Sequence, residues 1–261
     1  MQSISRFIKY TLASLFLISA PAHADLSDIL SNGIVKIAVP EAFAPFGSVG
    51  KTGEHEGYDV DVAKLIAKDL GVKLELVPVV SKQRIPFLET DRVDLVISTM
   101  GANPKRAKSI NFSSAYAPFY SGAFAASTVK VSKPADLDGL SVGVTRGTLE
   151  DLEITKTAPK GAKITRFGDN AATLSAFKSG QVDVLVAGNT AAAALASNNP
   201  SLDIVRKFII KDSPCFIGVK KGNEDLLRWV NVFILHKKLG GDLNKISQKW
   251  LGQDLPPLPS L

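Results

Sequence analysis

Arg106 is the side chain best placed to bind an anion. It follows Asn103 and Pro104, and Asn and Pro are favoured at the N-cap and at the first position of a helix. The spacing therefore predicts Arg106 in the first turn, where free backbone N–H groups and the helix dipole favour an anion. Its guanidinium could bind a carboxylate through two parallel hydrogen bonds. The alternative is a surface arginine beside Lys105 and Lys108.

A second group of polar residues follows an apolar run that is typical of a buried strand. Ser98 and Thr99 end this run and Gly101 follows in a predicted turn. Ligands of α/β proteins bind outside the carboxyl ends of the strands, so these residues are candidate contacts. Ser and Thr are also ordinary turn residues.

Further along the chain, Gly147 and Thr148 separate a predicted strand from a predicted helix. Thr148 is a plausible N-cap, and the helix start behind it is a second potential anion site. Capping alone would also explain the threonine.

Two aromatic residues and one further arginine complete the candidates. Phe43 and Phe46 follow the first predicted strand and could form a wall against a ligand, although isolated aromatic residues are more often core. Arg84 lies in a short predicted helix, either as a second anion contact or with its charged end reaching solvent.

Motifs for catalysis and for metal binding are missing. There is no Gly-x-Ser-x-Gly, phosphate loop or metal-binding His pair, and we expect no cofactor and no metal. Cys215 is the single cysteine, and its apolar neighbours favour a buried hydrophobe over a nucleophile.

The elements that must position these residues alternate between strands and helices, which predicts α/β units with largely parallel sheets. Strands are expected at 34–39, 73–80, 93–98, 140–144, 163–166 and 182–186, helices at 60–70, 86–88, 171–178, 224–238 and 242–250 and from 104, 148 and 190 onward, and crossings between lobes at 120–126 and 212–219. We expect one lobe from residues 25–121 plus 213–261, a second from 122–212, and a ligand cleft between them.

The N-terminus has the pattern of a signal peptide. Arg6 and Lys9 precede a short apolar stretch, and Ala22-His23-Ala24 fits a cleavage site. Removing 1–24 leaves 237 residues and lowers the formal charge from +6 by two, to about +4. We expect a soluble, monomeric periplasmic protein without a lipid anchor. The dispersed charges do not favour nucleic acid binding.

Seven segments, in order and spacing, resemble the extracellular solute-binding protein family 3, the polar amino-acid receptors of ABC importers. They are 42–46 (AFAPF), 57–61 (GYDVD), 93–98 (VDLVIS), 103–107 (NPKRA), 111–113 (NFS), 180–183 (GQVD) and 218–222 (GVKKG). The resemblance covers essentially the whole mature chain.

This resemblance implies a type II periplasmic-binding-protein fold, with two lobes, two hinge strands and a ligand enclosed as the lobes close. By position, Arg106 corresponds to the arginine that clamps the ligand's α-carboxylate, Ser98 and Gly101 to contacts at a strand end, Thr148 to the second-lobe carboxylate contact, and Phe43 to an aromatic that stacks on the ligand. The implied partners are the membrane subunits of an ABC transporter.

The sequence departs from the family at one position. The family's second lobe has an acid that binds the α-ammonium a few residues after Val-Asp, whereas Val186-Ala187-Gly188-Asn189 contains none. Asn189 could be a weaker, neutral acceptor. A ligand without a free α-amino group therefore stays an alternative.

Arg84 resembles the arginine that meets a side-chain carboxylate in acidic amino-acid receptors, which favours glutamate or aspartate over a neutral polar amino acid. We expect a binding protein and not an enzyme. The rival is a periplasmic enzyme on the same scaffold, similar to cyclohexadienyl dehydratase. Its catalytic acid would have to be Glu41 or Glu150. The simpler interpretation is that Glu41 is an ordinary loop residue and that Glu150 is an acid in the first turn of a helix.

Overall fold

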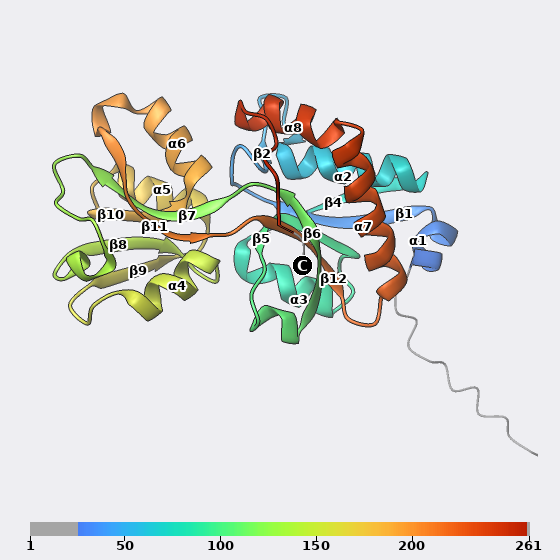
Figure 1. The fold of residues 1–261 in the computed structure, drawn as a ribbon, viewed down its shortest axis with the longest axis horizontal. Coiled ribbons are helices and arrows are strands. Elements are labelled where there is room, and N and C mark those ends of the chain that lie inside the picture. The colour runs from blue at the N-terminus through green and yellow to red at the C-terminus, as the bar shows by residue number, and fades with distance from the viewer. Residues whose placement is uncertain (1–25, 260–261) are drawn as a thin grey trace, which may run out of the picture.

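The computed structural model describes residues 26–259 and consists of two α/β lobes side by side (Figure 1). The predicted signal peptide lies outside the described residues. Within 26–259, no helix is both long enough and apolar enough to cross a membrane.

The first lobe has a five-stranded sheet in the order β4-β1-β5-β12-β6. Its strands are β1 (Ile34–Pro40), β4 (Lys73–Val79), β5 (Leu95–Gly101), β6 (Ile110–Ala117) and β12 (Cys215–Lys220), with a small hairpin of β2 (Ser48–Val49) and β3 (His55–Glu56). Its helices are α1 (Leu26–Asn32), α2 (Tyr58–Leu70), α3 (Arg84–Glu89), α7 (Glu224–Leu239) and α8 (Asp242–Leu251). Apolar residues of α2, α7 and α8 cover one face of this sheet and those of α3 cover the other (Figure 1).

The second lobe repeats this arrangement with the strand order β11-β7-β10-β8-β9. Its strands are β7 (Tyr120–Ala126), β8 (Ser141–Thr145), β9 (Lys163–Phe167), β10 (Val184–Gly188) and β11 (Ile204–Asp212), and its helices are α4 (Leu149–Thr157), α5 (Asn170–Lys178) and α6 (Asn189–Asn198). Residues of α4 are buried against one face of the sheet and residues of α5 and α6 against the other (Figure 1).

Both sheets are mixed, so the prediction of largely parallel sheets was wrong. β1 is parallel to β4 and β5, but β12 is antiparallel to β5 and β6. In the second lobe, β7 is antiparallel to β10 and β11. A strand that enters a lobe from its neighbour starts at the edge where the parallel strands end, and it must therefore run in the opposite direction.

The crossings are shorter than predicted. Tyr120–Ala126 is strand β7 of the second sheet, and the first crossing is the pair 118–119 between β6 and β7. The return crossing is the pair 213–214, because Cys215 already begins β12. The predicted lobe ranges of 25–121 plus 213–261 and 122–212 stay a proposal.

Several strands differ from the sequence prediction, which contained neither β6 nor the hairpin strands β2 and β3. β11 was not predicted, although residues 204–212 are rich in Ile and Val, which are common in strands. β5 runs to Gly101, three residues beyond the predicted end at Ser98. Polar Ser98 and Thr99 are tolerated inside the strand because other side chains satisfy their hydroxyls, as described below.

Candidate functional site

A small cavity lies between the lobes, where the strands of both sheets end. It is lined from the first lobe by Phe43, Arg84 and Thr99, from the crossing by Phe119, and from the second lobe by Thr145, Thr148, Glu150, Asn170, Val186, Ala187 and Gly188. Four of the candidate residues are therefore brought together in one cavity: Phe43, Arg84, Thr99 and Thr148.

Arg84 is buried at this cavity without an acidic partner. It is 5% exposed, and its Nε donates to Ser98 Oγ over 3.1 Å. Within residues 26–259 the guanidinium makes no other hydrogen bond and no ion pair. Burial and the nearby Arg106 lower the pKa of Arg84 to about 10, although the fields of Glu150 and Asp59 act in the opposite direction, so it stays charged at neutral pH. A buried cation of this kind needs an anion or strong acceptors.

Arg106 lies at the junction of the lobes, in the adjoining cavity that Arg84 also lines. Its Nη1 donates to the Gly101 carbonyl over 2.7 Å, and its Nη2 donates to the Gly147 carbonyl of the other lobe over 3.0 Å. Arg106 is 8% exposed and has no ion pair within the described chain. Burial lowers its pKa and the field of Glu150 raises it.

The expected helix around Arg106 is a single 3₁₀ turn, residues 106–108. Asn103 does cap it, since its Oδ1 accepts from the Arg106 N–H over 2.9 Å. The α-helical dipole argument therefore fails, and the prediction of an anion contact rests on the charge of the Arg106 guanidinium alone.

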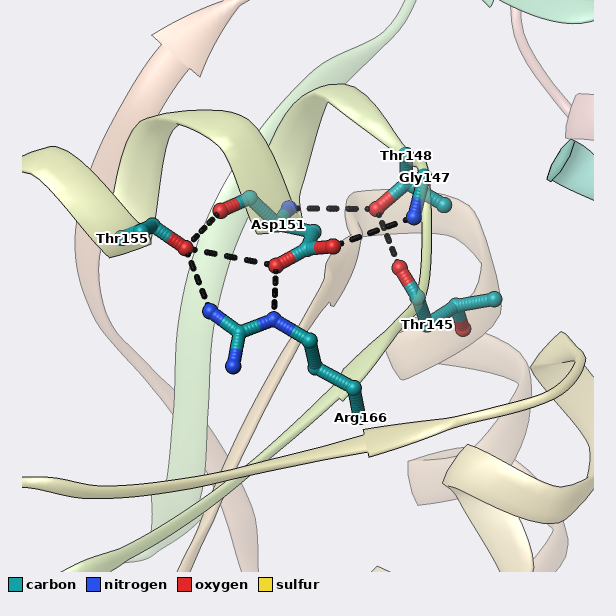
Figure 2. A network of polar contacts seen from close by, with 6 residues as sticks. All are labelled: Thr145, Gly147, Thr148, Asp151, Thr155 and Arg166. Carbon is teal, nitrogen blue, oxygen red and sulfur yellow. Dashed lines mark hydrogen bonds and ion pairs between the residues drawn. The ribbon is translucent and has the colours of Figure 1, made fainter.

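Thr148 is the N-cap of α4, as predicted. Its Oγ1 accepts from the Asp151 N–H over 3.2 Å and donates to the Thr145 carbonyl over 2.9 Å. Figure 2 shows that Asp151 also holds Gly147, the residue before Thr148, because Asp151 Oδ2 accepts from the Gly147 N–H over 3.1 Å. Asp151 Oδ1 accepts from Arg166 Nε over 2.7 Å. These contacts fix the loop that meets Arg106 from the second lobe.

Ser98 and Gly101 lie beside the arginines and not on the cavity wall. Ser98 is fully buried and accepts from Arg84, while the Gly101 carbonyl accepts from Arg106. A Cβ at Gly101 would lie 2.2 Å from Ser213 Oγ, so the Ser213 side chain on the return crossing would have to move to admit one. Their direct contact with a ligand stays a proposal.

Asp59 is a buried acid that hydrogen-bonds to Thr99. Nothing in the sequence indicated that Asp59 belongs to the site. Thr99 has a φ of +48°, which is unfavourable for a β-branched residue. Its Oγ1 donates to Asp59 Oδ2 over 2.8 Å, and Tyr116 donates to Asp59 Oδ1 over 2.6 Å. Burial raises the pKa of Asp59 to about 7, although both hydrogen bonds and Arg84 act in the opposite direction.

The aromatic wall has an unpredicted third member. Phe43 is stacked on Phe46 with ring centroids 5.9 Å apart, and Phe119 meets both rings edge-on at 6.3 and 5.9 Å. Phe46 is fully buried and supports Phe43 from behind. Phe119 lies on the first crossing, so only the three-dimensional structure brings it to the cavity.

Asn189 is turned toward the first crossing. Its Oδ1 accepts from the Tyr120 N–H over 3.1 Å, and it is absent from the residues that line the cavity. Its role as a ligand acceptor stays a prediction that this contact does not favour.

The two acids considered for a catalytic role differ in position. Glu41 is exposed in the loop after β1. Glu150 is 7% exposed in the first turn of α4, lines the cavity and accepts from Ser121 Oγ over 3.0 Å. In residues 26–259, no cluster of His, Cys, Asp and Glu has the arrangement of a metal site.

The fold and the cleft define a two-lobed solute-binding protein. The sequence matches the bacterial extracellular solute-binding proteins, family 3, over residues 35–253, and the chain belongs to this family.

Three relatives illustrate the membership. The ABC transporter glutamine-binding protein GlnH of Bacillus subtilis is 31% identical over 207 residues, covering 78% of this chain and 75% of that protein. The solute receptor for L-cysteine of Neisseria gonorrhoeae has a TM-score of 0.81 at 31% identity, covering 87% of this chain and 94% of that one. The ancestral amino acid-binding protein AncCDT-1, a precursor of cyclohexadienyl dehydratase, has a TM-score of 0.78 at 31% identity, covering 86% and 98%. All three are described as binding proteins or receptors, which supports the expectation that this chain is not an enzyme.

Proposed function

We propose that this protein is the amino-acid-binding component of an ABC importer. It binds a small acidic or polar amino acid between its lobes and presents the closed form to the membrane subunits. The observation that carries this proposal is the pair of buried guanidinium groups, Arg84 and Arg106, which meet only neutral oxygens of the described chain. Burying two cations without carboxylate partners is costly, and an anionic ligand between them would offset that cost.

Each arginine has a separate task in this proposal. Arg106 holds the α-carboxylate together with the Thr148 loop, and Arg84 meets the side chain of the ligand. Because Arg106 belongs to the first lobe and Thr148 to the second, a ligand held by both favours the closed form over the open one. Phe43 forms the apolar wall of the site.

The relatives support the class of ligand. GlnH is named a glutamine-binding protein of an ABC transporter, and the Neisseria protein is a receptor for L-cysteine. Export to the periplasm after cleavage of residues 1–24 and a monomeric state belong to the same proposal.

Ligand-stripped protein should be screened by thermal shift against the common amino acids, cystine, dicarboxylates and keto acids. A ligand at 100 times its Kd adds about 2.7 kcal/mol of stability, which for a domain of this size corresponds to a Tm increase of roughly 5–10 °C. Arg106→Ala should abolish the shift, whereas Lys105→Ala, at an exposed neighbour, should keep it. Shifts with keto acids and dicarboxylates but with no amino acid would contradict the proposal.

A further inference from the structure

Strand β10 ends at Gly188, and the structure leaves no room there for an acidic side chain. A Cβ built on Gly188 would lie 2.0 Å from Phe119 Cζ, far inside van der Waals contact. Phe119 therefore occupies the space that a carboxylate at this strand end would need. An acceptor for a cationic group of the ligand must come from another element.

Glu150 is the one acid among the described residues that line the cavity. It follows Thr148 by two residues in the first turn of α4, and both residues line the cavity from the second lobe. Its Oε1 accepts from Ser121, and no donor in residues 26–259 bonds its Oε2. Because Glu150 lines the cavity, a ligand that supplies an N–H group there can bond this oxygen.

The alternative is that the Glu150 carboxylate only neutralises the charges of the two arginines and does not bind a ligand. The field of Glu150 raises the pKa of both Arg84 and Arg106, but neither guanidinium is ion-paired with it, and both bond to neutral oxygens. The other buried acids near the cleft already use both of their oxygens, Asp59 with Thr99 and Tyr116, and Asp151 with Gly147 and Arg166. Glu150 thus remains as the carboxylate with an oxygen free for a ligand.

We infer that Glu150 accepts the α-ammonium group of the ligand in place of an acid at the end of β10. This inference rests on the proposed function and makes it more specific, because the ligand must then carry a free amino group. The ligand's carboxylate meets Arg106 in the first lobe and its ammonium meets Glu150 in the second. The α-carboxylate and the α-ammonium group of the ligand therefore bind different lobes and hold them together.

The test compares five amino acids with the same compounds lacking the α-amino group. The pairs are L-aspartate and succinate, L-glutamate and glutarate, L-glutamine and glutaramate, L-arginine and δ-guanidinovalerate, and L-cystine and dithiodipropionate. Kd values are measured by titration calorimetry for the wild type, for Glu150→Gln and for Glu153→Gln. Glu153 is the matched control, since it lies on the same helix and pairs with Lys156 and Lys211.

Wild type should bind at least one amino acid more tightly than its partner compound. In Glu150→Gln the affinity for that amino acid should fall roughly 30-fold or more, as for a buried charge pair broken on one side. The affinity for the compound without an amino group should stay the same or rise, and Glu153→Gln should match wild type.

An amino acid that binds Glu150→Gln as tightly as wild type would overturn the inference and leave the proposed function standing. An equal loss for both members of the pair would also overturn it, because Glu150 would then act on the arginines and not on the ammonium. Wild type that binds compounds without an amino group but no amino acid would overturn both. Circular dichroism of Glu150→Gln shows that the variant is folded, and glutamine keeps an oxygen for Ser121.

Discussion

Arg106 Nη2 donates a hydrogen bond to the Gly147 carbonyl oxygen over 3.0 Å, and this bond joins the two lobes at the mouth of the cleft. The same guanidinium donates to the Gly101 carbonyl of its own lobe. Because Asp151 holds the Gly147 N–H, the carbonyl that Arg106 meets belongs to a fixed loop. Arg106 therefore bridges the two lobes in this arrangement.

Replacing Arg106 should weaken ligand binding more than loss of one hydrogen bond would. Arg106→Ala removes a buried charge from the proposed carboxylate contact and also removes the bond to Gly147, so affinity should fall by about 2–5 kcal/mol. Arg106→Lys keeps the charge but loses the two-pronged geometry, and it should recover only part of the affinity. Titration calorimetry measures both, with Lys105→Ala as the control; equal affinity in all three variants would remove Arg106 from the site.

Arg84 should set the preference for the ligand's side chain. If it meets a side-chain carboxylate, wild type should bind glutamate or aspartate more tightly than the corresponding amide. Arg84→Met keeps much of the apolar volume and removes the charge, and it should lose this preference by at least about 2 kcal/mol because a buried charge pair is broken. Competition titrations with glutamate and glutamine measure the preference. A wild type that binds the amide at least as tightly would assign Arg84 to a neutral polar side chain instead.

Part of the fold is readable from sequence because its signals are local. The helix ending at Leu70 follows from its apolar spacing and from Gly71, which adopts the left-handed conformation that ends α2. The capping role of Thr148 follows from its position before a helix, and the structure confirms it. Such features depend only on residues a few positions apart.

The remaining parts of the site depend on contacts that no local pattern encodes. Phe119 reaches the cavity because the chain crosses between lobes there, and Asp59 reaches Thr99 across 40 residues of sequence. Glu150 looked like an ordinary first-turn acid, and only the packing of α4 against β7, which brings Ser121 to it, places its carboxylate at the cavity. Its position two residues after Thr148, a predicted site residue, is a sequence feature that could have indicated that Glu150 lies at the cavity.

Asp59 should make the protein less stable as the pH rises from about 4 to about 7. Its pKa in the folded protein is raised from 3.8 to about 7, so within this window the folded state holds a proton that the unfolded state has lost. The unfolded state binds fewer protons, and the free energy of unfolding therefore falls as the pH increases. Asp59→Asn does not titrate and can still accept from Thr99.

Urea denaturation of wild type and Asp59→Asn at several pH values from 4 to 8 measures this effect. Wild type should lose stability relative to the variant across the window, and the difference should change little above the folded pKa. A stability difference that is independent of pH would mean that Asp59 has an ordinary pKa in the folded protein.

Gly188 should tolerate no side chain while Phe119 keeps its position. The φ of Gly188 is −69°, which any residue can adopt, so the expected cost of Gly188→Ala is steric and comes from the 2.0 Å approach of the new Cβ to Phe119 Cζ. Overpacking of this kind costs about 1–3 kcal/mol, and it exceeds the gain of roughly 0.4–1 kcal/mol from a less flexible unfolded chain. Gly168→Ala, where a Cβ would meet no atom within 4 Å, is the matched control and should be neutral or slightly stabilising. Phe119→Leu should reduce the cost of Gly188→Ala in a double-mutant cycle followed by urea denaturation, and a cycle with no coupling would show that another contact limits the space at the end of β10.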